Sequence, residues 1–288
     1  MIRGMVIAFG PTAGGERKNG SIDMNMLRKA IGVSAALLAG LLLSGIASAA
    51  PVPAGWTCAG SCGTAGADGV VTLPPNGNAS YQWISTSGGQ DGVGGLPTGL
   101  LGSETNGSTL ATSIFAANAG TNLDFFFNFV TADGSNTWAD YAWAALFNSS
   151  GTLESLLFTA RTQGSGNIVP GVGMPPVNAV LTPASVTITG GAPIWSALGG
   201  SSGSCYAAGC GYTGWVNANY TIATAGNYYL QIGVTNWQDH GWDTGLAMSG
   251  VTVDGTPITD VPEPAELGMF GLGLLLIGAL AGLRRRVA

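Results

Sequence analysis

The chain has 288 residues, of which 46% are hydrophobic and only 8% are charged, and its formal net charge is −6. Residues 50–260 carry one basic side chain, Arg161, against eleven acidic ones, which gives this segment a net charge of −10. So acidic a surface repels phosphate backbones and argues against nucleic-acid binding. Aromatic and β-branched residues recur along the whole segment, which excludes the disordered class.

The first predicted element is a secretory signal. A basic pair, Arg28-Lys29, precedes an apolar stretch (residues 31–46) and an A-x-A site that ends at Ala49. We therefore assign residues 24–49 to a signal peptide that signal peptidase removes. Residues 1–23 have no such pattern, and we interpret them as a non-native or mis-annotated extension.

Residues 50–260 are predicted to form one extracellular all-β domain. Segments that alternate in polarity or run apolar are bounded by Gly, Asn and Asp, as strands joined by turns are. The spacing of the turns favours two antiparallel sheets packed as a jelly-roll-like β-sandwich. Residues 164–183, with four prolines, are expected to be a loop or a long crossover. Strands are expected at residues 69–73, 81–85, 108–115, 122–130, 141–148, 153–159, 184–189, 214–222, 226–235 and 245–253.

The four cysteines occur as two close pairs, Cys58 with Cys62 and Cys205 with Cys210. An exported protein meets an oxidising compartment, so disulfides are expected. Three pairings are possible. The Gly-rich surroundings favour local pairing, whereas cross-pairing would join the N-terminal part to the second half. A zinc ion held by all four thiolates also fits the spacing, but oxidised thiols do not bind it.

The richest polar cluster, residues 236–247, connects the last two predicted strands. Asp239 and Asp243 offer the hard oxygen ligands that calcium selects. Trp237 and Trp242, together with Asn236, could bind a sugar, because an aromatic face beside polar groups matches a pyranose ring. The alternative is that the two tryptophans plug the end of the sandwich while Asp243 caps a turn.

A second loop of the same type follows the strand at residues 122–130. It contains Asp133, Trp138 and Asp140, and its Asp-Gly pair alone would predict a plain hairpin turn. If both loops lie at one end of the sandwich, Asp133, Asp140, Asp239 and Asp243 could share one calcium ion. The two loops resemble the acidic loops of lectin-like jelly rolls.

Signals for catalysis are weak. His240 is the only histidine, and the one Gly-x-Ser-x-Gly match in the body, residues 199–203, lies in a Gly/Ser-rich run without the strand–helix context of a nucleophile elbow. Glu104 reads as part of a turn, and Glu154 as a strand residue facing water. We therefore expect no enzyme and assign no catalytic residue, with a secreted glycan hydrolase as the remaining alternative.

The C-terminal segment, residues 261–288, has three elements in order. The motif Pro262-Glu263-Pro264 is followed by an apolar run at residues 267–283 and then by Arg284-Arg285-Arg286. The run would make a transmembrane helix of about 25 Å, at the short end for a bilayer. The three arginines would stay on the cytoplasmic side and leave the rest of the chain outside.

This tail resembles the PEP-CTERM sorting tail of Gram-negative bacteria. The resemblance implies that an exosortase recognises the motif and removes the helix, and that the protein accompanies exopolysaccharide and biofilm production. The body is similar to those of other proteins with such tails, in which an Asp-Thr/Ser-Gly-Leu-Ala run, here starting at Asp243, enters a strand.

We therefore expect an exported cell-surface or extracellular-matrix protein that is anchored transiently in the inner membrane. Its lectin-like sandwich would bind exopolysaccharide. The alternative from another class is a structural matrix protein with no specific ligand.

Overall fold

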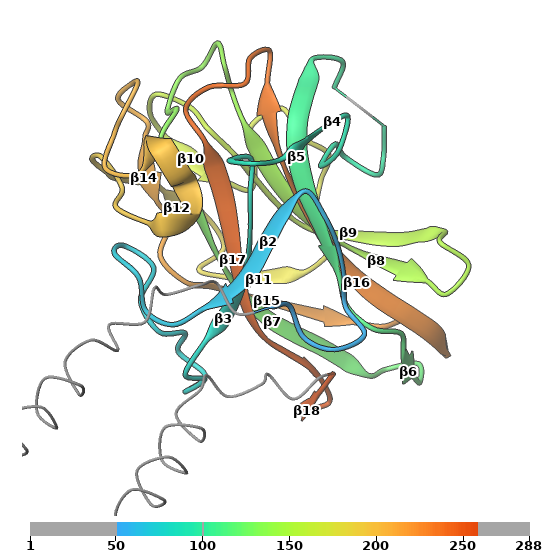
Figure 1. The fold of residues 1–288 in the computed structure, drawn as a ribbon. Helices are drawn as coiled ribbons and strands as arrows, with labels where there is room; N and C mark the ends of the chain where they lie inside the picture. The colour runs from blue at the N-terminus through green and yellow to red at the C-terminus, as the bar shows by residue number, and fades with distance from the viewer. Residues whose placement is uncertain (1–50, 100, 259–288) are drawn as a thin grey trace, which may run out of the picture. The chain divides into compact units, whose positions relative to one another are not determined.

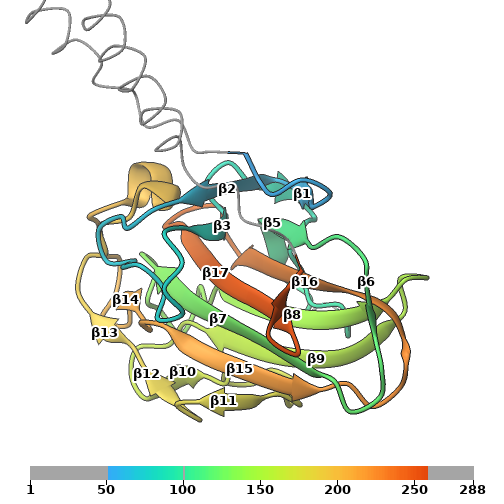
Figure 2. The same cartoon turned by 90° about the horizontal axis from the view of Figure 1, so that it is seen from below.

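The structure is a computed structural model that describes residues 51–99 and 101–258. These residues form an all-β domain of two packed antiparallel sheets (Figures 1 and 2). The predicted signal peptide and the C-terminal sorting tail lie outside them. Within the described ranges, no helix has the length and apolar character needed to cross a bilayer.

The first sheet, called sheet I, has the order β1-β5-β16-β8-β9, with β4 paired to β5 and β6 to β16. Its strands are β1 (Thr57–Ala59), β4 (Gln90–Asp91), β5 (Glu104–Ala111), β6 (Phe115–Ala117), β8 (Tyr141–Asn148), β9 (Leu153–Arg161) and β16 (Gly226–Trp237).

The second sheet, called sheet II, has the order β11-β15-β7-β17-β3-β2, with β14 paired to β7 and to β13, and β18 paired to β17. Its strands are β2 (Ser61–Ala65), β3 (Tyr81–Ser85), β7 (Asn122–Thr131), β11 (Val180–Thr182), β13 (Thr189–Gly190), β14 (Gly211–Tyr212), β15 (Val216–Thr221), β17 (Thr244–Val253) and β18 (Thr256–Pro257). A separate ribbon pairs β10 (Asn167–Val169) with β12 (Val186–Thr187), and a 3-10 helix, η1, spans Ser196–Ser201.

The long strands follow the jelly-roll order. Sheet I contributes β5-β16-β8-β9 and sheet II contributes β3-β17-β7-β15, so the chain repeatedly crosses between the sheets. Two interleaved Greek keys give this arrangement. The predicted all-β sandwich is therefore confirmed.

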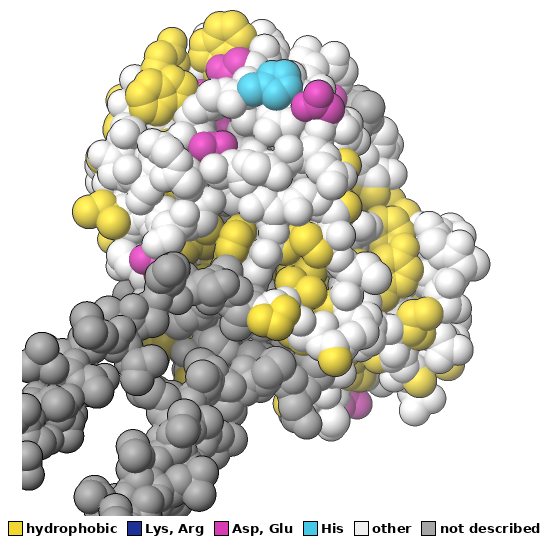
Figure 3. Space-filling view, in the orientation of Figure 1, with side chains coloured by type: hydrophobic (Ala, Val, Ile, Leu, Met, Phe, Trp, Pro, Cys, Tyr) yellow, Lys and Arg dark blue, Asp and Glu magenta, His cyan; other side chains and the backbone are white. Residues whose placement is uncertain are grey.

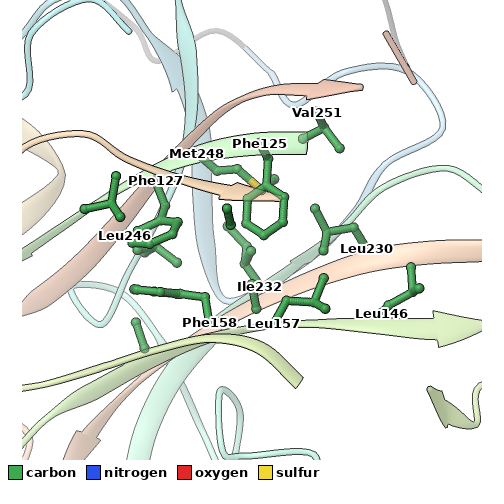
Figure 4. Close-up of a cluster of buried hydrophobic side chains, with 14 of the residues drawn as sticks. Phe125, Phe127, Leu146, Leu157, Phe158, Leu230, Ile232, Leu246, Met248 and Val251 are labelled. Atoms are coloured by element: carbon green, nitrogen blue, oxygen red, sulfur yellow. The ribbon is translucent and has the colours of Figure 1, made fainter. Parts of the chain in front are cut away.

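The main core lies between the sheets (Figure 4). Alternate residues of each strand point inward, as the period of a pleated strand requires. Sheet II contributes Phe125 and Phe127 of β7, and sheet I contributes Leu230 and Ile232 of β16. All four of these side chains are fully buried. The same alternation determines which side chains point inward at the ends of the strands.

The outer face of sheet I is covered as well. On β8 the residues that alternate with the core-facing ones include Tyr141 and Trp143, which form a second apolar cluster. The segment that leads into β5 lies over them, because Trp143 Nε1 donates to Gly94 O (2.7 Å) and the amide of Leu96 donates to the Tyr141 hydroxyl (3.1 Å). The Tyr141 hydroxyl in turn donates to Glu104 Oε1 (2.6 Å).

The predicted strands differ from the observed ones mainly near the N-terminus. Residues 69–73 form no strand and have only the isolated bridge between Asp68 and Val71. The strands β1 and β2 were not predicted, because their Gly- and Cys-containing sequences lack the alternation of a half-buried strand. The strand expected at 108–115 instead begins at Glu104 and continues after a break as β6. The segment 184–189 yields only the short β12 and β13.

The proline-rich segment 164–183 connects sheet I to sheet II, as its interpretation as a crossover requires. It leaves β9, contains β10 and β11, and adds β11 to the edge of sheet II beside β15. Figure 2 shows β10, β11 and β12 together along the edge near β15 and β9.

Both disulfides join the local pairs, Cys58 with Cys62 and Cys205 with Cys210. Local pairing is therefore confirmed, and the thiolates are not available for zinc. The first bridge links β1, which pairs within sheet I, to β2, which pairs within sheet II. It therefore ties the two sheets together at one edge of the sandwich.

A first prediction concerns Glu104. Burial tends to raise its pKa, but the hydroxyl of Tyr141 and the amides of Leu101 and Gly102 donate to the carboxylate, and the net effect lowers the pKa. A lowered folded-state pKa contributes stability that is present above the unfolded-state value, about 4.3, and is lost as the pH falls through the folded-state value.

Glu104→Gln is expected to lower the free energy of unfolding by about 1–3 kcal/mol at pH 7, because hydrogen bonds to a charged group are lost. The difference from wild type should shrink as the solution is acidified below the unfolded-state pKa. Urea unfolding at neutral and acidic pH measures both effects. A difference that does not depend on pH would contradict this account.

Candidate functional site

The two polar loops leave the same end of the sandwich, here called the loop end. Strand β7 ends at Thr131 opposite Thr244, where β17 begins. Strand β16 carries Thr235 opposite Tyr141, where β8 begins. The β7–β8 and β16–β17 loops are therefore neighbours, as the shared-site hypothesis requires. Figure 3 shows acidic, hydrophobic and histidine side chains together at the top of the molecule.

Beneath these loops a layer of polar side chains closes the apolar core. On the long strands other than β15 the inward positions beyond the core are polar, so that β8 changes from Ala142 to Asp140 and β16 from Val234 to Asn236. None of these side chains is more than 8% exposed. We call the set the polar layer; its members are Thr86, Asn106, Thr131, Asp133, Asp140, Thr162, Asn236 and Thr244.

Hydrogen bonds in the polar layer converge on Asp140. The hydroxyl of Thr244 donates to Asp140 Oδ2 (2.6 Å), and the amide of Trp237 donates to Oδ1 (2.9 Å). Because the single hydroxyl hydrogen of Thr244 is used in this way, Thr244 accepts from Thr131 Oγ1 at 2.8 Å. Thr131 accepts in turn from the amide of Asp133 (3.2 Å). Asp140 is therefore held from both sheets.

A second chain of hydrogen bonds runs from sheet I to the end of β3 in sheet II. Asn236 Nδ2 donates to Asn106 Oδ1 (3.0 Å), and Asn106 Nδ2 donates to Thr86 O (3.0 Å). Asn236, which the sequence suggested as a sugar ligand, is fully buried and belongs to this internal network. The prediction that it contacts an external sugar is therefore corrected.

Burial raises the pKa of both aspartates in the polar layer. Burial raises the pKa of Asp133 to about 6, against the hydrogen bonds from Ser135, and the Asp239 carboxylate adds to the rise. Burial also raises the pKa of Asp140 well above its usual range. The hydrogen bond from Thr244 opposes this rise, and the Asp133 and Asp239 carboxylates increase it. The three carboxylates therefore share one electrostatic environment.

Asp243 is placed differently from the other three predicted metal ligands. Its Oδ1 accepts from Thr86 Oγ1 (3.2 Å) and its Oδ2 from Ser201 Oγ (2.8 Å), at the end of η1. In residues 51–99 and 101–258 no group of three or more His, Cys, Asp or Glu side chains is arranged to hold a metal ion. The structure thus does not bring the four aspartates together around one ion.

The serine and the histidine that were weighed as catalytic residues also have identifiable contacts. Ser201, in the Gly-x-Ser-x-Gly match, bonds to Asp243, while His240 Nε2 lies 3.3 Å from Asp91 Oδ1 on the surface. The described contacts place Ser201 and His240 in separate interactions.

The predicted tryptophans separate into buried and exposed ones. Trp237 is only 9% exposed, with the Arg161 guanidinium 4.8 Å from its ring and Tyr141 beside it. It therefore packs the outer face of sheet I and cannot stack on a sugar, which corrects its predicted role. Trp138 is partly buried in the β7–β8 loop. Trp242 is 37% exposed at the loop end.

Trp242 pairs with an aromatic residue that the sequence analysis missed. Tyr206 is 50% exposed, and its ring lies 5.5 Å from that of Trp242 at an angle of 32°. We call these two residues the aromatic platform. The only sequence signal for Tyr206 was its place beside Cys205, because residues 206 and 242 are brought together by the fold alone.

The disulfide loop places Tyr206 in the platform. The amides of Tyr206 and Ala207 donate to the carbonyls of Ala132 and Asp133 (both 2.9 Å), just after β7. The approach is so close that a Cβ added to Gly134 would lie 1.9 Å from the amide nitrogen of Cys210. The Cys205–Cys210 loop therefore rests directly on the segment that carries Asp133.

The backbone of the platform is strained. Trp242 has φ 57°, and Gln238 in the same loop has φ 69°. These left-handed conformations are costly for residues with a Cβ, by about 1 kcal/mol or more each. Non-glycine residues held in this region are frequent at binding sites.

A pocket of about 160 Å³ lies at the opposite end of β17. Trp56, Asn76 and Gln82 are among the residues that line it, together with Pro257 close to the end of the described chain. Within the described residues, Trp56 Nε1 and Gln82 Nε2 are buried there without an acceptor. The sequence gave no indication of this pocket, because its residues come from distant segments.

A second prediction compares how much Trp237 and Trp242 each contribute to the stability of the fold. Trp237→Ala should lower the free energy of unfolding by about 3 kcal/mol, because a large buried ring is removed. Trp242→Gly should change it by less than about 1 kcal/mol, since relief of the left-handed backbone offsets the lost ring contact. Chemical denaturation measures both. Equal losses for the two variants would show that Trp242 is a packing residue.

No family model matches the sequence, and no curated protein matches it. Among solved structures, the K1 cleaved adhesin domain of Lys-gingipain from Porphyromonas gingivalis W83 has 12% identity and a TM-score of 0.32, over 70% of this chain and 91% of that one. The K3 cleaved adhesin domain of the same protein has 13% identity and a TM-score of 0.28, over 69% and 94%.

An exo-beta-agarase has 11% identity and a TM-score of 0.26, over 73% of this chain and 25% of that one. Likenesses this low carry no argument about function. The function must be argued from the residues of this chain.

Proposed function

We propose that this chain is an exported, non-catalytic surface or matrix protein whose sandwich binds a polysaccharide at the loop end. The observation that carries the proposal is the aromatic platform, an exposed Tyr206–Trp242 pair held by a strained backbone and a disulfide-closed loop. Aromatic faces beside polar groups match the apolar and hydroxylated faces of a sugar ring.

The charge around the platform narrows the ligand class. Asp239 and Asp243 flank Trp242 in sequence, and Asp91 lies beside His240 on the same surface. Between residues 51 and 258 the sequence has no lysine and only one arginine, Arg161, which lies over Trp237 instead. Such a surface disfavours polyanions. The proposed ligand is therefore a neutral exopolysaccharide of the producing cell.

Export and sorting are supported by different features. Two disulfides are typical of proteins outside the reducing cytosol. In this proposal the signal peptide at residues 24–49 directs export, and the PEP-CTERM-like tail at residues 261–288 directs sorting. In this proposal an exosortase recognises Pro262-Glu263-Pro264, removes the membrane helix and releases or transfers the protein to the cell surface or matrix of a Gram-negative bacterium.

A third prediction tests the platform. Wild-type protein should bind the producer's neutral exopolysaccharide saturably, and Trp242→Gly and Tyr206→Ala should each weaken binding by about tenfold or more, since each variant loses an aromatic face and the apolar area that it would bury, worth about 2 kcal/mol. Isothermal titration calorimetry measures the affinity. Ile114→Ala, which removes an exposed hydrophobic side chain from the β5–β6 turn, is the matched control and should bind normally.

Three outcomes contradict or replace this proposal. Unchanged affinity in both platform variants would move the site elsewhere. No saturable binding by folded wild-type protein, with loss of biofilm cohesion on deletion, would favour a purely structural matrix protein. Release of reducing ends from the polymer would indicate a hydrolase.

A fourth prediction tests sorting. Replacement of Pro262, Glu263 and Pro264 by alanine should leave the C-terminal segment attached, because the protease has lost its recognition motif. Mass spectrometry of the protein from the producing cells identifies the C-terminus. Pro257→Ala, upstream of the motif, serves as the control. The same mature C-terminus in the motif variant and in wild type would exclude this route.

A further inference from the structure

The polar layer contains two buried carboxyl groups and no protein cation. Asp133 and Asp140 are both 0% exposed. The only Lys or Arg in residues 51–258, Arg161, donates to Ala139 O and Val172 O and lies over Trp237. The one salt bridge in the described structure is the surface pair of His240 and Asp91. Buried carboxylates are costly unless a cation compensates them.

Oxygen atoms without a donor gather in the same layer. Asp133 Oδ2, Asn236 Oδ1 and Thr162 Oγ1 are buried and have no hydrogen-bond partner among the described residues. The other buried side-chain atoms of this kind in the described ranges are all nitrogens, on Trp56, Gln82 and Asn128, outside the layer. Buried oxygen atoms that lack a hydrogen-bond partner and lie in one layer are groups that a bound cation would satisfy.

Strand register places these atoms together. Thr235 lies opposite Tyr141 on β8, and Tyr141 lies opposite Arg161 on β9. One residue further toward the loop end, Asn236, Asp140 and Thr162 follow in a row across the three strands, and the amide of Thr162 donates to Asp140 O (2.9 Å). Alternation turns all three side chains to the inner face.

Asp133 comes from the facing sheet. Its backbone amide donates to Thr131, which is linked through Thr244 to the Asp140 carboxyl group, so a chain of hydrogen bonds joins the two residues. Its Oδ1 is taken by the amide of Ser135 (2.7 Å), which leaves Oδ2 free for another partner.

We propose that the polar layer binds a calcium ion, with Asp133 Oδ2, the Asp140 carboxylate, Asn236 Oδ1 and Thr162 Oγ1 as its protein ligands. These donors are all oxygens, carboxylate, amide and hydroxyl, which is the set that calcium accepts and that zinc does not prefer. Asp239 adds negative charge nearby, and Asp243 is not a ligand. The site is independent of the proposed sugar binding, because it lies inside the sandwich.

The first test uses the purified full chain, stripped with EDTA and dialysed against calcium, magnesium or zinc. Equilibrium dialysis should find one calcium bound per chain, with calcium preferred to the other two ions. Thermal unfolding should occur at a higher temperature in calcium than in EDTA, because an ion that binds only the native state stabilises it. No bound calcium, with the same unfolding temperature in both buffers, would overturn the proposal.

Two variants sharpen the test. Asp133→Asn is nearly isosteric and should weaken calcium binding by about a hundredfold or more, since a charged ligand is lost. In EDTA it should be at least as stable as wild type, because a buried unpaired charge is gone. Thr162→Val should also weaken calcium binding, to a smaller degree, and should not lower stability in EDTA. It replaces Asp133→Asn as the test if that variant does not fold.

Asp243→Asn is the matched control. This aspartate lies in the loop that joins β16 to β17, and its change should leave calcium affinity unaltered. Wild-type affinity in Asp133→Asn or Thr162→Val, or equal losses in Asp243→Asn, would contradict the assignment of the ligands.

Discussion

The structure depends on how the sandwich closes its core at the loop end. The long strands other than β15 change there from apolar to polar inward residues, and these polar side chains are buried rather than solvated. Such groups must satisfy one another, because an unpaired polar group inside the protein costs more than a solvated one. The carboxyl group of Asp140 provides a partner for groups from both sheets, because it accepts hydrogen bonds from the hydroxyl of Thr244 and from the amide of Trp237.

The surface features follow from that layer. Asp133 continues the inward face of β7, and its carbonyl receives the disulfide loop that holds Tyr206. Thr86 links the layer to Asp243, the residue after Trp242, so that the other half of the aromatic platform is fixed from below as well. The exposed pair therefore rests on an internal hydrogen-bond network rather than on a free loop, which would keep the entropy lost in the proposed binding low.

The sequence was informative where local pattern decides structure. Alternating or apolar segments such as 141–148 and 226–235 gave strands in nearly the observed places, and the Gly-rich surroundings of the cysteines favoured the observed disulfides. It failed where residues act through long-range register. Asp133 and Asp140 belong to the internal layer, Asp243 does not, and Trp237 is buried while Trp242 is exposed. These differences depend on strand pairing that no local pattern contains, and Tyr206 was missed for the same reason.

The central claim is that the loop end is the binding surface, and it is tested most directly by oxidative footprinting of the full chain with and without the producer's exopolysaccharide. The polymer should protect Tyr206 and Trp242 from oxidation and leave the partly exposed Tyr220 and Tyr229, at the opposite end of the sandwich, unchanged. Equal oxidation of Tyr206 and Trp242 in both samples, under conditions where the polymer is bound, would contradict the claim.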